Sequence, residues 1–431
     1  MIKNSIREIR VVIAQALARV VLKKYKPFVI AVTGSVGKTS TKDTIYTALK
    51  DSLSVQKNVK SFNGDLGTPL TILGRTDAKN TVMAWIKNFW AGITLIIFRK
   101  SYPKYLILEI GLGKPGEIRR IASWLRPHIV VVTRLSKTPV HVEFFKSVKE
   151  LVDEKGSLVD AMRSDGTVIL NSDDPDVAGF YTRTKATPIF YGQSEKASLR
   201  AVNYKIKYDN NAKPLGVDFE ILYGDTKTPL FIERTLGKQH IYPVLAALSV
   251  GLSLSIDYKK MIDALARHDT PPGRMRLIDG INDSTIIDDT YNASPVALDE
   301  ALMTLGDIST TGRKIIVIGD MKELGGLSVD AHRDAGIAAA KLANMIIGVG
   351  NESKKLIDGA LTQGFDRSRT AYFSDSRSAG IYLKTQINSR DIILVKGSQS
   401  MRMEKTVMEI MKNPEKKESL LVRQEKYWER R

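Results

Sequence analysis

The sequence predicts an α/β protein with a central P-loop ATPase-type parallel sheet domain, followed by a smaller Rossmann-like α/β C-terminal domain. The first observation is that short, β-branched apolar runs such as 28–32, 105–109 and 129–133 alternate with helical stretches. The second is a glycine-rich loop at 33–39, between the first of these runs and a helical stretch. The third is length, because 431 residues exceed one ordinary core and favour two or three domains.

Four segments follow one another along the chain. Residues 1–26 are typical of a basic amphipathic helix, and residues 27–270 of the central domain, with hairpin-like edge strands near its end at 201–234. The run Pro271-Pro272-Gly273 breaks the pattern and predicts a domain boundary. The second α/β domain then covers residues 271–415, with strands predicted at 284–288, 314–318, 345–349 and 391–395, and residues 416–431 form a charged tail.

The composition excludes some kinds of site and leaves others open. The chain has no cysteine, so a disulfide framework, a thiol nucleophile and a cysteine metal site are excluded, which fits a reducing cytoplasm. The formal net charge of +18 at pH 7 would attract nucleic acid, anionic lipid or a polyanionic substrate, or else belongs to a solvated lysine-rich surface. Both interpretations stay open, because the basic residues are spread along the chain.

Two apolar segments bear on membrane contact. Residues 1–26 combine cations with apolar side chains at helical spacing, so this helix either lies on an anionic membrane or packs on its own protein with a cationic outer face. Residues 82–98 hold two tryptophans but are short of the roughly 20 residues that span a bilayer, which predicts a buried or interfacial helix. The apolar residues of the first segment that recur at helical spacing are Ile2, Ile6, Ile9, Ile13, Leu17 and Val20.

The glycine-rich loop predicts an anion site. A strand that leads into such a loop at a helix N-terminus points backbone N–H groups inward, and the helix dipole adds partial positive charge. Lys38 can reach terminal phosphates, and the hydroxyl of Thr39 can ligate Mg²⁺. Val32 stands where the common pattern has its first glycine, so the chain carries the shorter T-G-x-x-G-K-T form. The expected phosphate contacts are Gly34, Ser35, Val36, Gly37, Lys38, Thr39 and Ser40.

Three further residues are candidates for a metal–phosphate site. Glu109 ends a predicted buried strand, at the edge where parallel sheets gather ligands, and its carboxylate suits Mg²⁺. His141 is by itself either a structural histidine or a metal ligand, and Lys155 is either a surface lysine or a site residue. The spacing of these residues in the sequence does not decide between the two interpretations of each.

Seven segments then match one family in order: TGSVGKTS at 33–40, NGDLGTPLTIL at 63–73, EIGLGKPGEI at 109–118, LNSDDP at 170–175, IDDTYNASP at 287–295, GDMKELG at 319–325 and VKGSQSMRME at 395–404. On these segments the chain resembles the Mur ligases of peptidoglycan synthesis. The first is shared across that superfamily, whereas the last three resemble its D-alanyl-D-alanine-adding members.

The resemblance implies an ATP-dependent amide ligase. Transfer of the γ-phosphoryl group of ATP to a carboxylate gives an acyl phosphate, which an amine then attacks. The family implies D-alanyl-D-alanine as the amine and a UDP-muramoyl-tripeptide-like acceptor, with no nucleic acid partner. It implies a cytoplasmic enzyme, and contact of the two apolar segments with the inner face of the plasma membrane stays open. The oligomeric state is not implied.

The resemblance also implies roles for particular residues. Lys38 and the loop amides would hold the ATP phosphates, and Thr39 and Glu109 would ligate one Mg²⁺, with His141 serving a second. Lys155 matches the lysine that is carbamylated in many members, a change that turns a cation into an oxygen ligand for the metal. Lys38, Lys155 and His141 would thus be catalytic. The remaining implied contacts are Arg274 and Asp289 to the nucleotide and Asn63, Asn292 and Ser294 to the substrates.

The chain departs from the family pattern mainly where the acceptor would be held. The phosphate loop starts at residue 33, where the family usually has a preceding domain for the uridine nucleotide end. The family stretch G-x-H-N-x-x-N, which helps to seat adenine, is replaced at Gln239, His240 and Pro243, and residues 82–98 are additional. We therefore expect the reaction type to be kept and recognition of the carrier end to differ.

Two rival functions stay open on the sequence alone. Another amino-acid ligase of the superfamily, similar to folylpolyglutamate synthase, would also carry its phosphate loop near the N-terminus. A nucleic-acid-binding P-loop ATPase would fit the net charge of +18, with Glu109 as its acidic strand end, but no patch of interleaved basic and aromatic residues is evident.

Overall fold

The computed structural model describes residues 2–59, 62–75, 81–111, 114–135, 145, 147–425 and 428. The chain divides into two compact units. Unit 1 comprises Met1–Val202, Ile221–Thr228 and Ile241–His268, and unit 2 comprises Asn203–Glu220, Pro229–His240 and Asp269–Arg431. These units are defined by contacts between residues, which is a different criterion from a domain boundary along the sequence. The domain ranges expected from the sequence therefore stay predictions.

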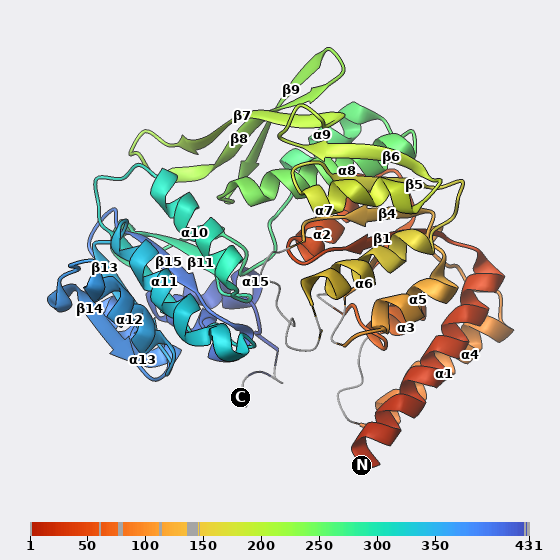
Figure 1. Ribbon diagram of the computed structural model, residues 1–431, viewed down its shortest axis with the longest axis horizontal. Helices are drawn as coiled ribbons and strands as arrows, with labels where there is room; N and C mark the ends of the chain where they lie inside the picture. Colours follow the sequence, from red (N-terminus) through yellow and green to blue (C-terminus); the bar gives the residue numbers. More distant parts are fainter. Residues whose placement is uncertain are drawn as a thin grey trace. The chain divides into compact units, whose positions relative to one another are not determined.

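A nine-stranded sheet with the order β2-β3-β1-β4-β5-β6-β7-β8-β9 starts in unit 1 (Figure 1). The strands from β2 to β7 pair in parallel, whereas β7, β8 and β9 are joined by connections too short for a parallel crossover and so run antiparallel. The strands are β1 (Phe28–Thr33), β2 (Val55–Lys57), β3 (Tyr105–Glu109), β4 (Ile129–Val132), β5 (Thr167–Asn171), β6 (Thr187–Gly192), β7 (Leu199–Tyr208), β8 (Pro214–Tyr223) and β9 (Thr226–Glu233).

Helices bury both faces of the parallel strands, which is why these strands are apolar throughout. Val29 and Ala31 face a core cluster completed by α1, α5 and α6, and their neighbours Ile30 and Val32 are buried on the opposite face. The helices of unit 1 are α1 (Ile2–Tyr25), α2 (Lys38–Leu49), α3 (Gly67–Ile72), α4 (Val82–Ile97), α5 (Glu117–Leu125), α6 (Val148–Asp160), α7 (Pro175–Ala178), α8 (Ile241–Ser253) and α9 (Tyr258–Ala266).

Helices α1 and α4 lie side by side and run parallel (Figure 1). The guanidinium of Arg10 stacks over Trp85 at 4.8 Å, and one heptad later a Cβ at Gly92 would approach Leu17 to 3.2 Å. One further heptad along, the Nζ of Lys24 donates to the carbonyls of the last turn of α4. These hydrogen bonds satisfy backbone carbonyls that the last turn of a helix otherwise leaves without a partner inside the helix. Within the described part of the chain, no helix has the length and apolar character to cross a bilayer.

Unit 2 holds a six-stranded sheet with the order β10-β11-β15-β12-β13-β14. All pairs are parallel except β10–β11. Its strands are β10 (Arg276–Asp279), β11 (Thr285–Asp289), β12 (Lys314–Gly319), β13 (Met345–Val349), β14 (Thr370–Phe373) and β15 (Ile392–Lys396). Its helices are α10 (Pro295–Asp307), α11 (Ser328–Ala340), α12 (Ser353–Thr362), α13 (Ser376–Lys384), α14 (Glu404–Ile410) and α15 (Lys417–Leu420). The predicted fold class, a P-loop-type parallel sheet followed by a smaller α/β sheet, is confirmed.

The close contact at Gly92 gives a prediction for stability. Gly92→Val should lower the free energy of unfolding by about 1–3 kcal/mol, because the added branch would push Leu17 and Leu73 away from α4. Urea unfolding followed by circular dichroism measures the change, and Lys87→Val, at an exposed position of the same helix, is the control. A Gly92→Val protein as stable as the control would contradict the packing of α1 on α4.

Candidate active site

The loop between β1 and α2 is shaped by two glycines with positive φ angles. Gly34 has φ 142° and Gly37 has φ 84°. A Cβ at Gly34 would lie only 2.0 Å from the hydroxyl oxygen of Thr133, so no side chain fits there. The backbone N–H of Ser35 donates to the carbonyl of Arg134 at 2.6 Å, which holds the loop against the end of β4.

The N-terminus of α2 opens into this loop. Lys38 is the first residue of the helix, and its Nζ donates to the carbonyl of Ser35 at 3.0 Å, so the side chain lies back over the loop. The side chains of Thr39 and Ser40 are buried beside it. A helix N-terminus, a glycine loop and a lysine head group together make a site suited to phosphate.

Lys155 reaches the same loop from a distant part of the sequence. Helix α6, which Ser147 caps by accepting from the N–H of Glu150 at 3.1 Å, carries Lys155 to where its Nζ donates to the carbonyl of Gly34 at 3.0 Å. Burial holds the pKa of this lysine well below its usual range, and the neighbouring charge of Lys38 lowers the pKa further. Lys155 is therefore buried beside the glycine-rich loop and is not a surface lysine, while its catalytic role stays a prediction.

Glu109 lies at the end of β3, paired in register with Val32 at the end of β1. Its Oε1 accepts from the side-chain amide of Asn63 at 2.6 Å, and its backbone N–H donates to the side chain of Asn58 at 2.6 Å. Its Oε2 is buried with no hydrogen-bond partner among the described residues, and the nearest cation is Lys42 at 3.8 Å. A buried carboxylate oxygen without a hydrogen-bond donor fits a metal ligand.

Two of the residues that surround Glu109 were missed by the sequence reasoning. Lys42 lies one helical turn after Lys38 on α2 and is fully buried, which lowers its pKa. Asn58 is also fully buried. The spacing of four between the two lysines was the available signal for the first, whereas no signal marked the second. His141 lies outside the described residues, which themselves contain no cluster of three potential metal-ligating acids or histidines.

In unit 2 the predicted nucleotide and substrate residues follow the end of β11. Asp289 faces Lys396, its register partner at the end of β15, with Nζ and Oδ2 2.5 Å apart. Lys396 also donates to the carbonyl of Asn292 at 3.0 Å, and the side-chain oxygen of Asn292 accepts from the N–H of Gln399 at 3.2 Å. Lys396 lies in the segment VKGSQSMRME, which carries part of the family resemblance, but it was not predicted as a site residue.

The other two predicted residues of unit 2 flank the same loop. The guanidinium of Arg274 lies 4.2 Å from the ring centroid of Tyr291, and the N–H of Tyr291 donates to the carbonyl of Gly273 at 3.0 Å. Ser294 caps α10 by accepting from the N–H of Ala297 at 3.4 Å. The structure therefore brings Arg274, Asp289, Asn292 and Ser294 to one end of unit 2, while their ligands stay predictions.

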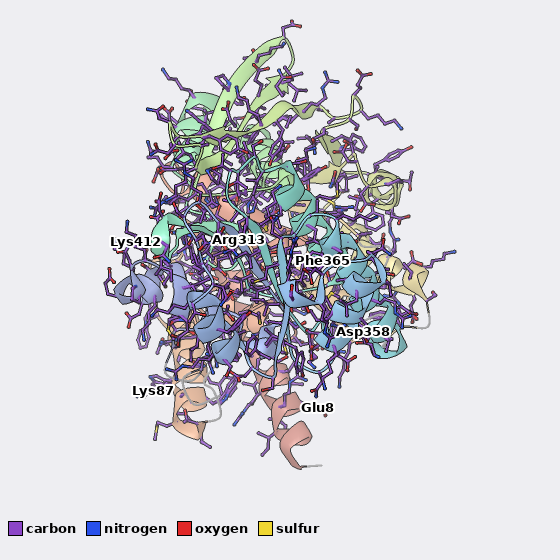
Figure 2. The ribbon with its side chains drawn as sticks, turned by 90° about the vertical axis from the view of Figure 1, so that its left-hand side faces the viewer. Glu8, Lys87, Arg313, Asp358, Phe365 and Lys412 are labelled. Carbon is purple, nitrogen blue, oxygen red and sulfur yellow. The ribbon has the colours of Figure 1, made fainter. Side chains whose placement is uncertain are left out.

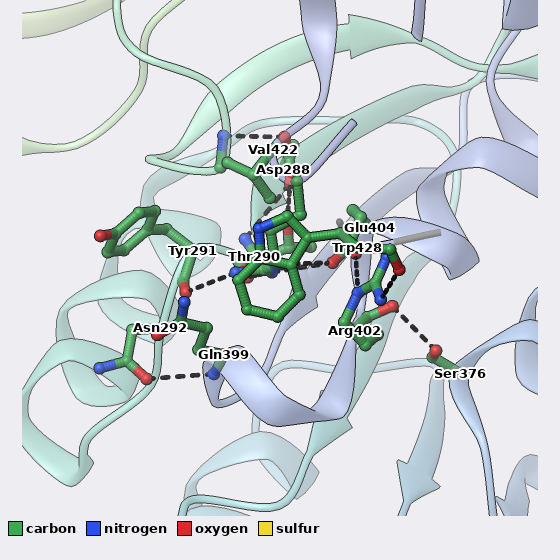
Figure 3. A network of polar contacts seen from close by, with 12 residues as sticks. Asp288, Thr290, Tyr291, Asn292, Ser376, Gln399, Arg402, Glu404, Val422 and Trp428 are labelled. Carbon is green, nitrogen blue, oxygen red and sulfur yellow. Dashed lines mark hydrogen bonds and ion pairs between the residues drawn. The ribbon is translucent and has the colours of Figure 1, made fainter. Parts of the chain in front are cut away.

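A buried network from the C-terminal tail holds this loop (Figure 3). Arg423 pairs with Glu404 at 2.8 Å and donates to the carbonyls of Thr290 and Tyr291 at 2.5 and 3.0 Å. The second oxygen of Glu404 accepts from Arg402 at 2.5 Å. The described part of the tail is thus tied to the loop after β11 by buried charge.

A buried carboxyl holds the start of the same loop. Asp288 accepts from the N–H of Gly273 at 2.9 Å and from the hydroxyl of Thr290 at 2.6 Å. Burial raises the pKa of Asp288 to about 6. These contacts join the Gly273 turn to the end of β11 within unit 2.

Comparison with known families gives two matches that follow each other along the chain. Residues 32–251 match the Mur ligase middle domain, and residues 273–399 match the Mur ligase, glutamate ligase domain.

Similar proteins in the curated set carry one name. The UDP-N-acetylmuramoyl-tripeptide–D-alanyl-D-alanine ligase of Bacillus subtilis is 27% identical over 401 residues, which cover 93% of this chain and 79% of that protein. The protein of the same name from Escherichia coli is 25% identical over 391 residues, covering 89% and 77%.

Solved structures show the same fold at lower identity. MurF ligase from Thermotoga maritima in complex with ADP superposes with a TM-score of 0.75 at 24% identity, covering 94% of this chain and 84% of that one. Folylpolyglutamate synthase from Mycobacterium tuberculosis, complexed with ADP and AMPPCP, superposes with a TM-score of 0.65 at 14% identity, covering 91% and 95%.

We expect the buried ion pair in the network of Figure 3 to contribute more to the free energy of unfolding than an exposed ion pair of unit 2. Arg423→Ala should lower the free energy of unfolding by about 3 kcal/mol, because Glu404 would keep a buried charge with one partner removed. The matched change Arg377→Ala, which breaks the exposed pair with Glu409, should cost less than about 1 kcal/mol. Chemical denaturation of both variants measures the difference, and equal losses would show that the buried network adds nothing.

Proposed function

The chain belongs to the Mur ligase family, and we propose on this basis that it joins D-alanyl-D-alanine to a UDP-muramoyl-tripeptide-like acceptor. It is an ATP-dependent ligase of peptidoglycan precursor synthesis. The observation that carries the proposal is the match, over about four-fifths of their length, to relatives named for this reaction. The glycine-rich loop of unit 1, with Lys38 at the N-terminus of α2, supports the proposal, because such a loop is suited to the phosphates of ATP.

The chain's own residues account for the first half of the reaction. The loop amides, the N-terminus of α2 and Lys38 bind the triphosphate and orient its γ-phosphorus toward the acceptor carboxylate. A carboxylate oxygen attacks that phosphorus, the bond to the β–γ bridging oxygen breaks, and ADP leaves. The amine of the dipeptide then attacks the acyl carbon, loses a proton and expels phosphate, so an amide forms.

We propose that Thr39 and Glu109 hold one Mg²⁺ and that His141 and Lys155 serve a second. The carboxylate oxygen of Glu109 without a hydrogen-bond partner among the described residues supports the first of these. A bound Mg²⁺ would neutralise phosphate charge as the γ-phosphoryl group moves.

Carbamylation of Lys155 is part of the same proposal. Only a neutral amine adds to CO₂, and burial beside Lys38 favours the neutral form of Lys155. The carbamate carries a negative charge, so it would replace a repulsion with Lys38 by an attraction and present oxygen atoms to a metal.

A second candidate is a ligase that adds an amino acid in the manner of folylpolyglutamate synthase. The structure of folylpolyglutamate synthase from Mycobacterium tuberculosis superposes with a TM-score of 0.65 at 14% identity, which supports a shared fold. Family membership gives no support to the alternative of a nucleic-acid-binding ATPase.

We also propose that the enzyme acts in the cytoplasm, with α1 and α4 in contact with the inner face of the plasma membrane.

A substrate panel tests the proposed reaction. Phosphate release should require ATP, UDP-muramoyl-tripeptide and D-alanyl-D-alanine together, and omitting any one should reduce it to background. Glutamate with a folate acceptor serves as the competing pair. Release with glutamate and none with the dipeptide would sink the proposal in favour of the second candidate.

The role of Lys155 is tested against a lysine on the same helix. Lys155→Ala should lower kcat at least 100-fold, because both the positioning of the loop and the carbamate oxygens are lost. Lys149→Ala, at an exposed position of α6, should stay within twofold of the unchanged protein. Removing dissolved CO₂ should lower the activity of the unchanged protein, and bicarbonate should restore it. Full activity of Lys155→Ala would remove this lysine from the mechanism.

A further inference from the structure

We infer that α1 and α4 form one binding surface for anionic lipid, by which the chain docks flat on a membrane. The inference deepens the membrane contact of the proposed function by naming the surface and its ligand, and it is independent of which substrates are ligated. We call this surface the α1/α4 face, and it consists of Ile6, Ile9, Val12, Ile13, Val20, Val82, Met83, Ile86, Trp90, Ile97 and Phe98.

Helix α1 is apolar on two opposite sides. Val11, Ala14, Ala18 and Val21 are buried against unit 1. The other side would be polar in an ordinary surface helix, but here it shows apolar residues spaced by three, four and seven, among them Ile9 at 59% exposed. The outer side of the helix therefore carries apolar residues as well as cations such as Arg19 and Lys23.

Helix α4 repeats the pattern. Trp85, Asn88 and Gly92 are buried, while Met83, Ile86, Trp90 and Ile97 follow one another along the exposed side. Trp90 is 64% exposed. Tryptophan is enriched at membrane–water interfaces, where its apolar ring and its N–H group meet their preferred surroundings.

The two exposed sides combine into a single surface. The helices run parallel. They are joined by the Arg10–Trp85 stack, by the contact between Leu17 and Gly92, and by the hydrogen bonds from Lys24 to the last turn of α4. On each helix the exposed apolar residues lie opposite those packed against unit 1, so both exposed sides point the same way. Contiguous exposed apolar surface of this kind marks an interaction site.

Charge identifies the ligand. Residues 2–25 and 82–100 contain nine lysines and arginines but one acid, Glu8. Lys87 and Glu8, labelled in Figure 2, lie on the two helices. Each cation near an anionic membrane contributes about 1 kcal/mol of attraction. If a second copy of the chain bound here instead, the nine cations of one copy would face the nine cations of the other. The repulsion between these like charges disfavours self-association through this surface.

The mode of binding is interfacial. No described helix can cross a bilayer, and α4 has 16 residues, so at 1.5 Å per residue it is shorter than the roughly 30 Å of a hydrocarbon core. A helix pair with an apolar side and flanking cations lies in the plane of the membrane, with the apolar side chains among the acyl chains.

Flotation of the full chain with lipid vesicles tests the inference. The protein should float with vesicles of phosphatidylcholine and phosphatidylglycerol at 3:1 and remain at the bottom with phosphatidylcholine alone. Ile9→Glu combined with Trp90→Glu should lower the partition constant at least tenfold. The matched control combines Met303→Glu with Ile381→Glu, two comparably exposed apolar positions of unit 2, and should float like the unchanged protein.

Three outcomes would overturn the inference. The first is that the unchanged protein fails to float with anionic vesicles, and the second is that the Ile9/Trp90 variant floats equally well. The third is that light scattering without lipid finds a dimer that the same variant abolishes. A thermal melt and phosphate release with soluble substrates establish that the variant is folded, and they report on the ligase proposal separately from lipid binding.

Discussion

The contact between Gly34 and Thr133 is the constraint around which the unit 1 site is built. Because there is no room for a Cβ at Gly34, the chain can turn directly under the end of β4, and the backbone groups of the next residues become available to the site. The carbonyl of Gly34 then accepts from Lys155, and the N–H of Ser35 donates to Arg134. A single residue without a side chain thus lets β1, β4, α2 and α6 meet at one point.

Lysines and carboxylates gather at that point. Lys42 and Lys155 are buried, and Lys38 lies over the loop. Lys42 lies 3.4 Å from Asp43 and 3.8 Å from Glu109, and the charge of the buried Glu154 acts on Lys155. Buried ammonium groups are costly unless anions compensate them. The triphosphate of the proposed reaction would add negative charge beside Lys38 and Lys155.

Local patterns in the sequence predicted the fold class and the phosphate loop, because a strand, glycine turn and helix are specified within a few residues. Lys396 was not predicted, since its pairing with Asp289 depends on the register of two strands 107 positions apart. Arg423 was missed for a similar reason, because a charged residue in a tail gives no sign that it will be buried against Glu404. The sequence left the outer side of α1 open, because spacing identifies an apolar side without showing which of two such sides packs inward. The ligand roles of Arg274, Asn292 and Ser294 remain predictions.

The parallel pair of α1 and α4 has a kinetic consequence. A molecule that rests on a sheet of lipid explores an area and not a volume, so it meets anything else confined to that sheet at an effective concentration set by surface density. A membrane-bound enzyme would then meet a lipid-anchored precursor by lateral diffusion, even if its affinity for the carrier part of that precursor were low. Surface confinement would in this way add to the selectivity that direct contacts with the carrier provide.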